Sequence, residues 1–411
     1  MHKPDNFDFD ILIAGGGAAG LTAAIGAGME LSKHHRNEKR GQSFRIGLIE
    51  KKEIPGKKLS ATGNGRCNLS NAACEDRTEV DVFFHHLGIL TRTDEAGRMY
   101  PYSEEAGEVS ALLTETARAY HTEIMTNCQV LAVEQCSENC GGFVVSIGQE
   151  PGKVKEKLRC RLVMLAMGGK SYSVFGTTGD GYGISRKLGH KVTRLAPSLV
   201  PVTVEEDLKS LAGVRTKALV RLEHLGTCIY EELGEVQINK DAVSGICVMN
   251  LSRLLKLNPE ASSFAEAFRE YEITLDLVPE LSLEELESLL ERKESAQGME
   301  GALSTLVKKK LAYAVLAERE DWTVKELASH LKEYRFHVTG TKGWNDAQVT
   351  RGGVELTEVN PDTMESNLVE GLYFSGEIMD FDGPCGGYNL HYAWLSGLRG
   401  GRAMAQKLLE K

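Results

Sequence analysis

Apolar runs alternate with glycine turns and helical stretches over the first 188 residues. The run at 10–14 passes through a glycine-rich turn into the small-residue stretch 21–27, and the run at 46–50 ends in an acid. Short apolar runs bounded by glycine are typical of buried strands, and strands that alternate with helices favour a parallel βαβ layer. Three further strands and a helix are predicted at 126–134, 142–147, 159–167 and 182–188.

The pattern changes near residue 189. From there to residue 251 the apolar segments are short, β-branched and interrupted by glycine or proline, which predicts a small antiparallel sheet or barrel. The predicted strands of this part are 191–195, 199–204, 217–222 and 227–229.

Helical signals dominate residues 251–335. Ser282 with Glu285, and Thr323 with Glu326, have the spacing of a capping box, in which a hydroxyl and a carboxylate each satisfy a free N–H group. Two helix starts are therefore predicted. The remaining predictions are β segments at 335–339 and 348–358, a strand at 372–377 and a final helix at 388–407.

Size and composition are those of an ordinary globular protein with more than one domain. The chain has 411 residues, of which 42% are hydrophobic and 26% charged. No apolar run reaches the ~20 residues of a membrane span, and the polar start does not match a signal peptide. We therefore expect a cytoplasmic protein without a membrane partner.

Cysteine usage and charge exclude some classes of site. The nine cysteines are scattered and odd in number, which favours free thiols in a reducing compartment. Cys136 and Cys140 have no second pair or nearby histidine, so no metal site is predicted. A net charge of −10 gives no general attraction to nucleic acid, although it leaves a local basic groove open. We interpret the cluster 308–310 as a solvated helix face.

The first glycine turn has the order required for dinucleotide binding. Gly15, Gly17 and Gly20 join a strand to a helix, so that the free N–H groups of the helix start point at one place. Glu50 ends the next predicted strand, where a carboxylate can bind ribose hydroxyls. It lies 30 residues beyond Gly20, and the polar stretch 32–43 accounts for this long spacing as an insertion. The alternative is that Glu50 is only a solvated strand end.

Later glycine clusters extend this site. They lie at 168–169, 176–181, 376–377 and 383–389, after predicted strands or before predicted helices. Because the carboxyl ends of parallel strands line one crevice, one long ligand explains all these turns. Contacts from both ends of the chain favour FAD over NAD, whose site is usually confined to one stretch. Purely structural turns are the alternative.

Several motifs together closely resemble the YhiN-type flavoproteins, the family that also contains aminoacetone oxidases and BaiN-type reductases. These motifs cover almost the whole chain and lie at 60–71, 175–183, 347–354, 363–366 and 386–390. The segment 178–181 also resembles fumarate-reductase-like flavoproteins. Ser244-Gly245-Ile246-Cys247 departs from the Ser-Gly-Pro turn that is frequent in the family.

The resemblance implies bound FAD and an α/β fold. The expected architecture is a Rossmann-like FAD-binding domain of the two-dinucleotide-binding type, with an inserted β-rich domain and an inserted helical domain. The expected boundaries are 1–188 with 353–411 for the FAD-binding domain, 189–250 with 335–352 for the β-rich domain, and 251–334 for the helical domain.

The glycine turns and the resemblance together predict the cofactor-binding residues. The set comprises Gly15, Gly17, Ala18, Ala19, Gly20, Glu50, Lys51, Lys58, Thr62, Gly63, Asn64, Arg66, Cys67, Asn68, Val130, Ala166, Gly168, Gly169, Thr178, Gly179, Asp180, Gly181, Gly376, Glu377, Gly387, Tyr388, Asn389 and Leu390.

Three of these residues are candidates for chemistry. Arg66 can bind a phosphate or a substrate anion through its guanidinium, and a surface ion pair is the alternative. Asn389 is predicted to cap the last helix and touch the flavin. Tyr388 is a candidate proton donor, against the commoner structural tyrosine. Cys67 and Cys385 lack a C-x-x-C partner, so no redox disulfide is predicted.

The leading functional hypothesis is an FAD-dependent oxidoreductase that transfers hydride at flavin N5 to or from a small organic substrate. Reduction of a C=C bond with NAD(P)H and oxidation of an amine with oxygen both stay open. No second G-x-G-x-x-G follows a strand, so a nicotinamide would dock transiently.

Two other hypotheses are a flavoenzyme that reduces a pyrimidine in rRNA, with residues 308–310 as phosphate contacts, and a flavin-binding protein without turnover. The substrate and the oligomeric state are not predicted.

Overall fold

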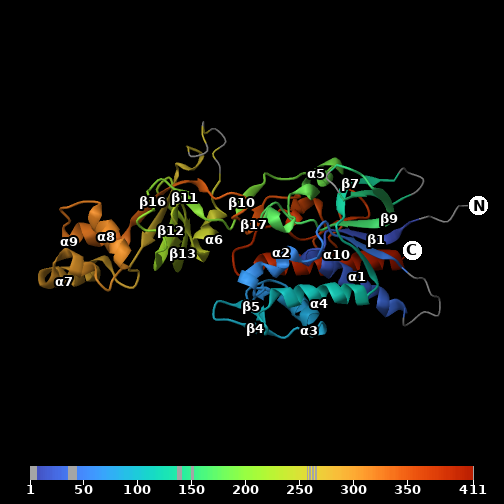
Figure 1. The fold of residues 1–411 in the computed structure, drawn as a ribbon, viewed down its shortest axis with the longest axis horizontal. Helices are drawn as coiled ribbons and strands as arrows, with labels where there is room; N and C mark the ends of the chain where they lie inside the picture. Colours follow the sequence, from blue (N-terminus) through green and yellow to red (C-terminus); the bar gives the residue numbers. More distant parts are fainter. Residues whose placement is uncertain are drawn as a thin grey trace, which may run out of the picture. The chain divides into compact units, whose positions relative to one another are not determined.

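The computed structural model describes residues 7–35, 44–136, 141–149, 152–256, 258, 261, 263 and 266–410 (Figure 1). Its contacts divide the chain into two compact units. Unit 1 comprises residues 1–196 and 349–411, and unit 2 comprises residues 197–348. Cys140 of the C-x3-C pair and most of the 32–43 stretch lie outside the described residues.

Unit 1 is built on a seven-stranded sheet with the order β6-β2-β1-β9-β8-β7 and with β18 beside β9. The central pairs β2–β1, β1–β9 and β9–β18 are parallel, whereas β7 and β8 are antiparallel. The strands are β1 (Phe9–Ala14), β2 (Ile46–Ile49), β6 (Thr122–Met125), β7 (Gln129–Gln135), β8 (Phe143–Gly148), β9 (Glu156–Leu165) and β18 (Leu372–Phe374).

The alternating side chains of β1 contribute to two separate cores. Ile11 and Ile13 pack with the helical side, whereas Leu12 and Ala14 pack with residues of β7, β8 and the segment after β18. The helices of the first side include α1 (Ala18–His35), α4 (Ala106–Ala119) and α10 (Tyr388–Leu409), which run along one side of the sheet in Figure 1. A strand buried on both faces explains the continuous apolar runs of the sequence.

Glycines let α1 and α10 approach closely. A Cβ atom on Gly401 would overlap the carbonyl oxygen of Ala23, and one on Gly397 would approach that of Ala19 almost as closely. The contact is filled by buried side chains that include Leu21 and Trp394. The two ends of the chain are therefore packed together within unit 1.

Smaller elements complete unit 1. They are α2 (Lys57–Ser60), α3 (Arg77–His86), α5 (Asp180–Lys187), a sheet of β3 (Ser70–Asn71), β5 (Arg98–Pro101) and β4 (Thr91–Thr93), and β17 (Val349–Arg351).

Unit 2 contains a closed six-stranded barrel, as the β-branched pattern predicted. Its strands are β11 (Val202–Val204), β14 (Val243–Ser244), β13 (Thr227–Ile238), β12 (Arg215–His224), β15 (Tyr271–Asp276) and β16 (Tyr334–Thr341), with β10 (Ala196–Ser198) just before them. The turn at Gly245 leads from β14 into α6 (Ile246–Ser252), whose residues Val248 and Leu251 are buried against the barrel core.

Three helices lie between the barrel strands β15 and β16 in the chain: α7 (Leu283–Leu303), α8 (Lys309–Ala317) and α9 (Val324–Lys332). Both predicted capping boxes are confirmed, at Ser282 with Glu285 and at Thr323 with Glu326. Leu286 and Leu331 of these helices share one buried cluster with the barrel. The division of the chain into three domains stays a prediction.

Some predicted elements are wrong. The stretch 251–335 is not wholly helical, because β15 is inserted in it between β12 and β16. The stretch 191–195 contains only one isolated bridge, at Val192, and 348–358 contains β17 followed by a turn of 3-10 helix. These segments are short, and their pairing depends on partners distant in sequence.

Candidate functional site

The predicted glycine turns meet at the carboxyl edge of the unit 1 sheet. Ala14 pairs with Leu165, and Leu165 with Phe374, so that β1, β9 and β18 end in register. The next residues continue this edge: Ala166 N donates to Ala14 O at 2.8 Å and Ser375 N donates to Leu165 O at 3.1 Å. Three turns from the two ends and the middle of the chain therefore lie side by side.

The turn between β1 and α1 requires glycine at two positions and is open at a third. Gly15 has φ 110°, and a Cβ on Gly20 would overlap Gly15 O. A Cβ on Gly17 would meet no heavy atom within 4 Å. The first N–H groups of α1 have no partner within the helix, so this open turn suits a pyrophosphate.

Glu50 follows β2 at the same edge. Its Oε2 accepts from Gly16 N at 2.9 Å and its Oε1 from Lys52 N at 2.7 Å. Burial raises the pKa of the Glu50 carboxyl, although these hydrogen bonds oppose the shift. The carboxylate is thus fixed beside the helix start, where ribose hydroxyls can donate to it.

Lys51 connects this strand end to the start of α5. Its Nζ donates to Thr178 Oγ1 at 2.6 Å and to Asp180 Oδ2 at 2.7 Å, and Gln129 Nε2 donates to Asp180 Oδ2 at 3.1 Å. Partial burial of Asp180 favours its neutral form, but the hydrogen bonds from Lys51 and Thr178 outweigh burial and lower its pKa. Val130 is buried within the sheet, and its contact with a cofactor stays a prediction.

A second polar cluster surrounds Glu377. Lys58 Nζ donates to Glu377 Oε2 at 2.6 Å and to Ser171 Oγ at 2.8 Å. Glu377 Oε1 accepts from Ser171 Oγ and from Thr350 N, each at 2.9 Å. Gly169 is required here, because a Cβ would overlap Thr350 Oγ1. Sequence reasoning missed Ser171 as a site residue, and its place just after the 168–169 turn was the available signal.

The loop after α2 is held in an unusual backbone conformation. Gly63, Asn64 and Gly65 have φ values of 58°, 55° and 84°, and Cys67 has φ 59°. Left-handed non-glycine residues cost about 1–3 kcal/mol each and cluster at functional sites. Burial raises the pKa of the Cys67 thiol to about 12, so the thiol stays neutral and is a poor nucleophile.

Arg66 has protein partners outside the glycine turns. Its guanidinium lies 4.9 Å from the centre of the Tyr100 ring and 3.9 Å from Glu104 Oε2. This is the surface ion pair that was the alternative to anion binding, and the role of Arg66 toward a ligand stays a prediction.

The residues at the start of α10 differ in what they contact. Asn389 Oδ1 accepts from Gly383 N and its Nδ2 donates to Gly383 O, both at 2.8 Å. Gly387 lies against Ser70 O and near Asn68. Leu390 packs on the core shared by α1 and α10. Within the motif 347–354, Gln348 belongs to unit 2, whereas Thr350 and Arg351 belong to unit 1.

These observations fit FAD. Gly17 leaves space for a phosphate, and Glu50 places a carboxylate where a ribose would lie. The buried Asn68 Oδ1 has no hydrogen-bond partner among the described residues, so it can accept from a ligand. The chemistry of these groups therefore fits a dinucleotide, and the residue-by-residue contacts stay a prediction.

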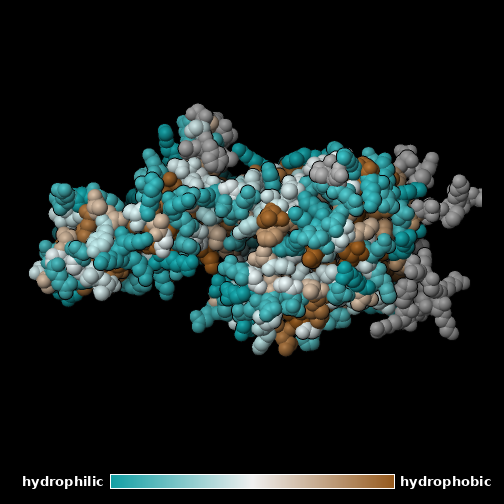
Figure 2. All heavy atoms as spheres, viewed as in Figure 1, coloured by the Kyte–Doolittle hydropathy of each residue, from teal (hydrophilic) through white to brown (hydrophobic). Residues whose placement is uncertain are grey.

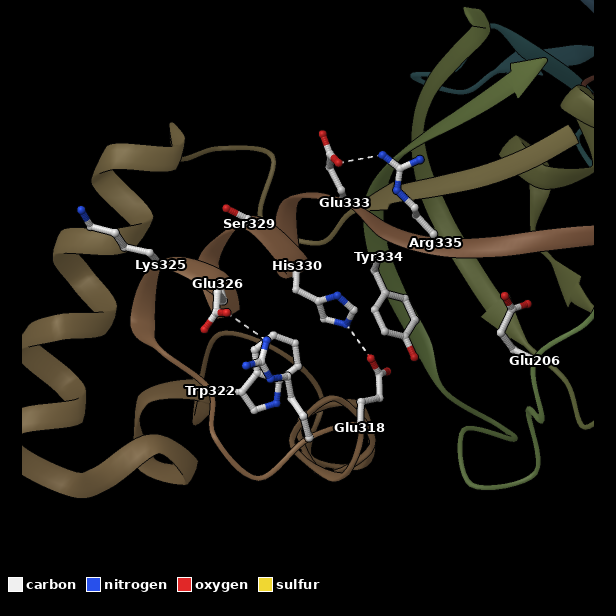
Figure 3. A pocket seen from close by; sticks show the side chains of 11 residues that line it. Glu206, Glu318, Trp322, Lys325, Glu326, Ser329, His330, Glu333, Tyr334 and Arg335 are labelled. Atoms are coloured by element: carbon white, nitrogen blue, oxygen red, sulfur yellow. Dashed lines mark hydrogen bonds and ion pairs between the residues drawn. The ribbon is translucent and has the colours of Figure 1, made fainter. Parts of the chain in front are cut away.

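A separate groove of about 720 Å³ lies in unit 2, lined mainly by α9 and its neighbours (Figure 3). His330 lies between the rings of Trp322 and Tyr334, and its Nε2 is 2.9 Å from Glu318 Oε2. Burial lowers the pKa of His330, although Glu318 opposes the shift. None of the predicted site residues lines this groove.

On the face seen in Figure 2, apolar side chains of the described residues form separate patches among hydrophilic ones. Within the described part of the chain, no helix combines the length and hydropathy needed to cross a membrane.

Comparison with known proteins gives one family match and several full-length relatives. The model of the HI0933-like protein Rossmann domain matches residues 76–403. A 3-dehydro-bile acid delta(4,6)-reductase of Clostridium scindens is 33% identical, covering 96% of this chain and 98% of its own length. Ribosomal RNA dihydrouridine synthases of Escherichia coli and Haemophilus influenzae are each 27% identical, covering 94% of this chain and 96% of their own length.

Proposed function

The chain belongs to the HI0933-like family and is an FAD-dependent oxidoreductase, and from this premise we propose that it reduces a carbon–carbon double bond conjugated to a ketone in a small organic substrate. The meeting of three glycine turns at one sheet edge supports this edge as the proposed place of the cofactor. The name of the Clostridium scindens relative supports the substrate class, since it describes a reductase of a 3-dehydro-bile acid.

The residues of the edge would hold the cofactor in a fixed order. The first N–H groups of α1 would bind the pyrophosphate, Glu50 would accept from the adenosine ribose, and Lys51 with Asp180 would flank that end. Asn68 and the start of α10 would face the ring system. FAD, when bound there, supplies hydride transfer through N5.

We further propose NAD(P)H as the electron donor. The sequence has no second G-x-G-x-x-G after a strand, so the nicotinamide would dock only for the transfer. Oxidation of an amine with oxygen is the competing reaction, and the two differ in whether a nicotinamide or the substrate itself reduces the flavin.

An anaerobic titration tests the proposal. Purified protein should carry FAD, NADH or NADPH should bleach it, and a 3-dehydro-Δ4,6 bile acid should restore the oxidised spectrum. Bleaching by an amine, with no response to either nicotinamide, would establish the oxidase instead. A protein that remains free of FAD after reconstitution would refute the cofactor assignment.

A second candidate is reduction of a pyrimidine in rRNA, which two 27% identical relatives favour by name. The candidate phosphate contacts Lys308, Lys309 and Lys310 are exposed, but Lys310 Nζ donates to Ala212 O and Lys309 lies over the Tyr313 ring. Dihydrouridine formed in transcribed rRNA fragments with NADPH would support this candidate. Absence of salt-sensitive binding to such fragments would count against it.

A further inference from the structure

The turn at 383–387, which precedes α10, is held by amide side chains from two sides. Asn389 pairs with Gly383 through both its oxygen and its nitrogen, at 2.8 Å each. Asn71, at the end of β3, donates to Gly386 O at 3.0 Å. Asn71 is buried, and its Oδ1 is fixed by Ala73 N at 3.0 Å.

The glycines of this turn do not by themselves favour one conformation. Gly386 and Gly387 have φ values of 117° and 106°, and Gly387 begins the helix without a side-chain capping bond. Glycine at such positions is the most flexible residue of the unfolded chain, so the conformation must be imposed by neighbours. The two amides and the close contact of Gly387 with Ser70 O supply that constraint.

The consequence of this turn is the direction of α10. The first intrahelical bond runs from His391 N to Gly387 O, so the earlier N–H groups of this 22-residue helix have no partner within it. The positive end of the helix dipole lies at the same place. The unpartnered acceptor Asn68 Oδ1 is 2.9 Å from the position that a Cβ on Gly387 would take.

We propose that Asn71 and Asn389 are positioning residues that jointly fix the 383–387 turn, so that the free N–H groups of α10 stabilise negative charge on the reduced flavin. This inference rests on the FAD site of the proposed function. It adds a role for Asn389, whose amide is engaged by Gly383; the predicted contact of Asn389 with the flavin stays a prediction.

The test is the two-electron midpoint potential of the bound flavin, measured anaerobically against a reference dye. Asn71→Ala and Asn389→Ala should each lower the potential by about 30 mV, which corresponds to a tenfold loss in stabilisation of the reduced form. The double variant should fall little further than the lower single variant, since both amides act through one turn. Asn367→Ala, which removes an exposed amide bond to Thr357 O, is the matched control and should leave the potential unchanged.

Additive shifts in the double variant would overturn the joint role, and unchanged potentials would overturn the positioning role altogether. Hydrogen exchange of the backbone amides of residues 383 and 385–387 in the apoprotein gives an independent readout, expected to quicken in both single variants. Asn71→Ser and Asn389→Ser replace any alanine variant that does not fold. If the variants show these shifts but the protein reduces no enone, the positioning role of Asn71 and Asn389 stands and the proposed reaction is refuted.

Discussion

Lys58 Nζ lies 2.6 Å from Glu377 Oε2, although 319 residues separate the two in the chain. The ion pair is about four-fifths buried, with side-chain exposures of 23% and 19%. Ser171 contacts both partners, and Thr350 N donates to the same carboxylate. The pair therefore joins four segments of unit 1 at the edge where the glycine turns meet.

Removing one partner of this pair should destabilise unit 1. Lys58→Met leaves the largely buried Glu377 carboxylate without its charge partner. We expect the free energy of unfolding to fall by about 1–2 kcal/mol, less than the 3–5 kcal/mol that is typical when a fully buried pair is broken. Urea unfolding of the apoprotein measures it. Lys33→Met is the control, because the Lys33–Glu30 pair at 2.8 Å has a 64% exposed lysine and should contribute within about 0.5 kcal/mol. Equal effects in the two variants would contradict the role assigned to Lys58.

FAD binding should weaken as the pH is lowered because of Glu50. A ribose hydroxyl donates best to the ionised carboxylate, and burial raises the Glu50 pKa above its ordinary 4.5. The affinity for FAD is therefore greatest above this raised pKa and decreases as the pH falls through it. Dissociation constants measured by flavin fluorescence from pH 8 to 5 should rise in the wild type. Glu50→Gln should bind about tenfold more weakly and lack this acid-side loss; an unchanged profile in the variant would assign the loss to another group.

The sequence predicts the parts of this molecule that local chemistry decides. The turn at Gly15, the acid at Glu50 and the capping box at Ser282 each depend on neighbours within a few residues or on one strand–turn–helix unit. Parallel strands then bring the separate turns to one edge without further information. This is why the composition of the edge could be predicted before its geometry.

Long-range pairing decides what the sequence does not reveal. The strand Tyr271–Asp276 stands within a helical stretch, and it is stabilised by pairing with β12 and β16 of the barrel. Ser171 has no motif of its own, and its side chain joins the site through Lys58 and Glu377. The pairing of Arg66 with Tyr100 and Glu104 likewise depends on how the small β3–β5–β4 sheet folds.

The contact of α1 with α10 should be sensitive to a single methyl group. Gly401→Ala would place a Cβ atom onto Ala23 O. We expect this overpacking to lower the free energy of unfolding by about 1–3 kcal/mol. Gly107→Ala is the matched control, since this glycine in α4 has nothing within 4 Å of a Cβ position and alanine favours the helix by up to ~1 kcal/mol. Thermal unfolding should show shifts of opposite sign, and a stabilised Gly401→Ala would refute the close helix contact.

Two histidines of unit 2 should give opposite pH dependences of stability. Burial lowers the pKa of His330, so its contribution is present above its ordinary 6.5 and is lost as pH falls through the folded-state value. The hydrogen bond to Glu206, at 2.7 Å, raises the pKa of His337, and Glu272 is also nearby. The contribution of His337 to stability is therefore present below 6.5 and is lost as pH rises through the folded-state pKa.

Urea unfolding of His330→Gln and His337→Gln at pH 5.5 and 8 separates the two contributions. Relative to wild type, His330→Gln should gain stability from pH 8 to 5.5, whereas His337→Gln should lose it. The centre of the Trp322 ring lies 5.0 Å from that of the His330 ring, so Trp322 supplies a second readout. Its fluorescence should change below pH 6.5 in the wild type and not in His330→Gln. The same slope in both variants would show that other groups, Glu206 and Glu318 among them, govern the titration.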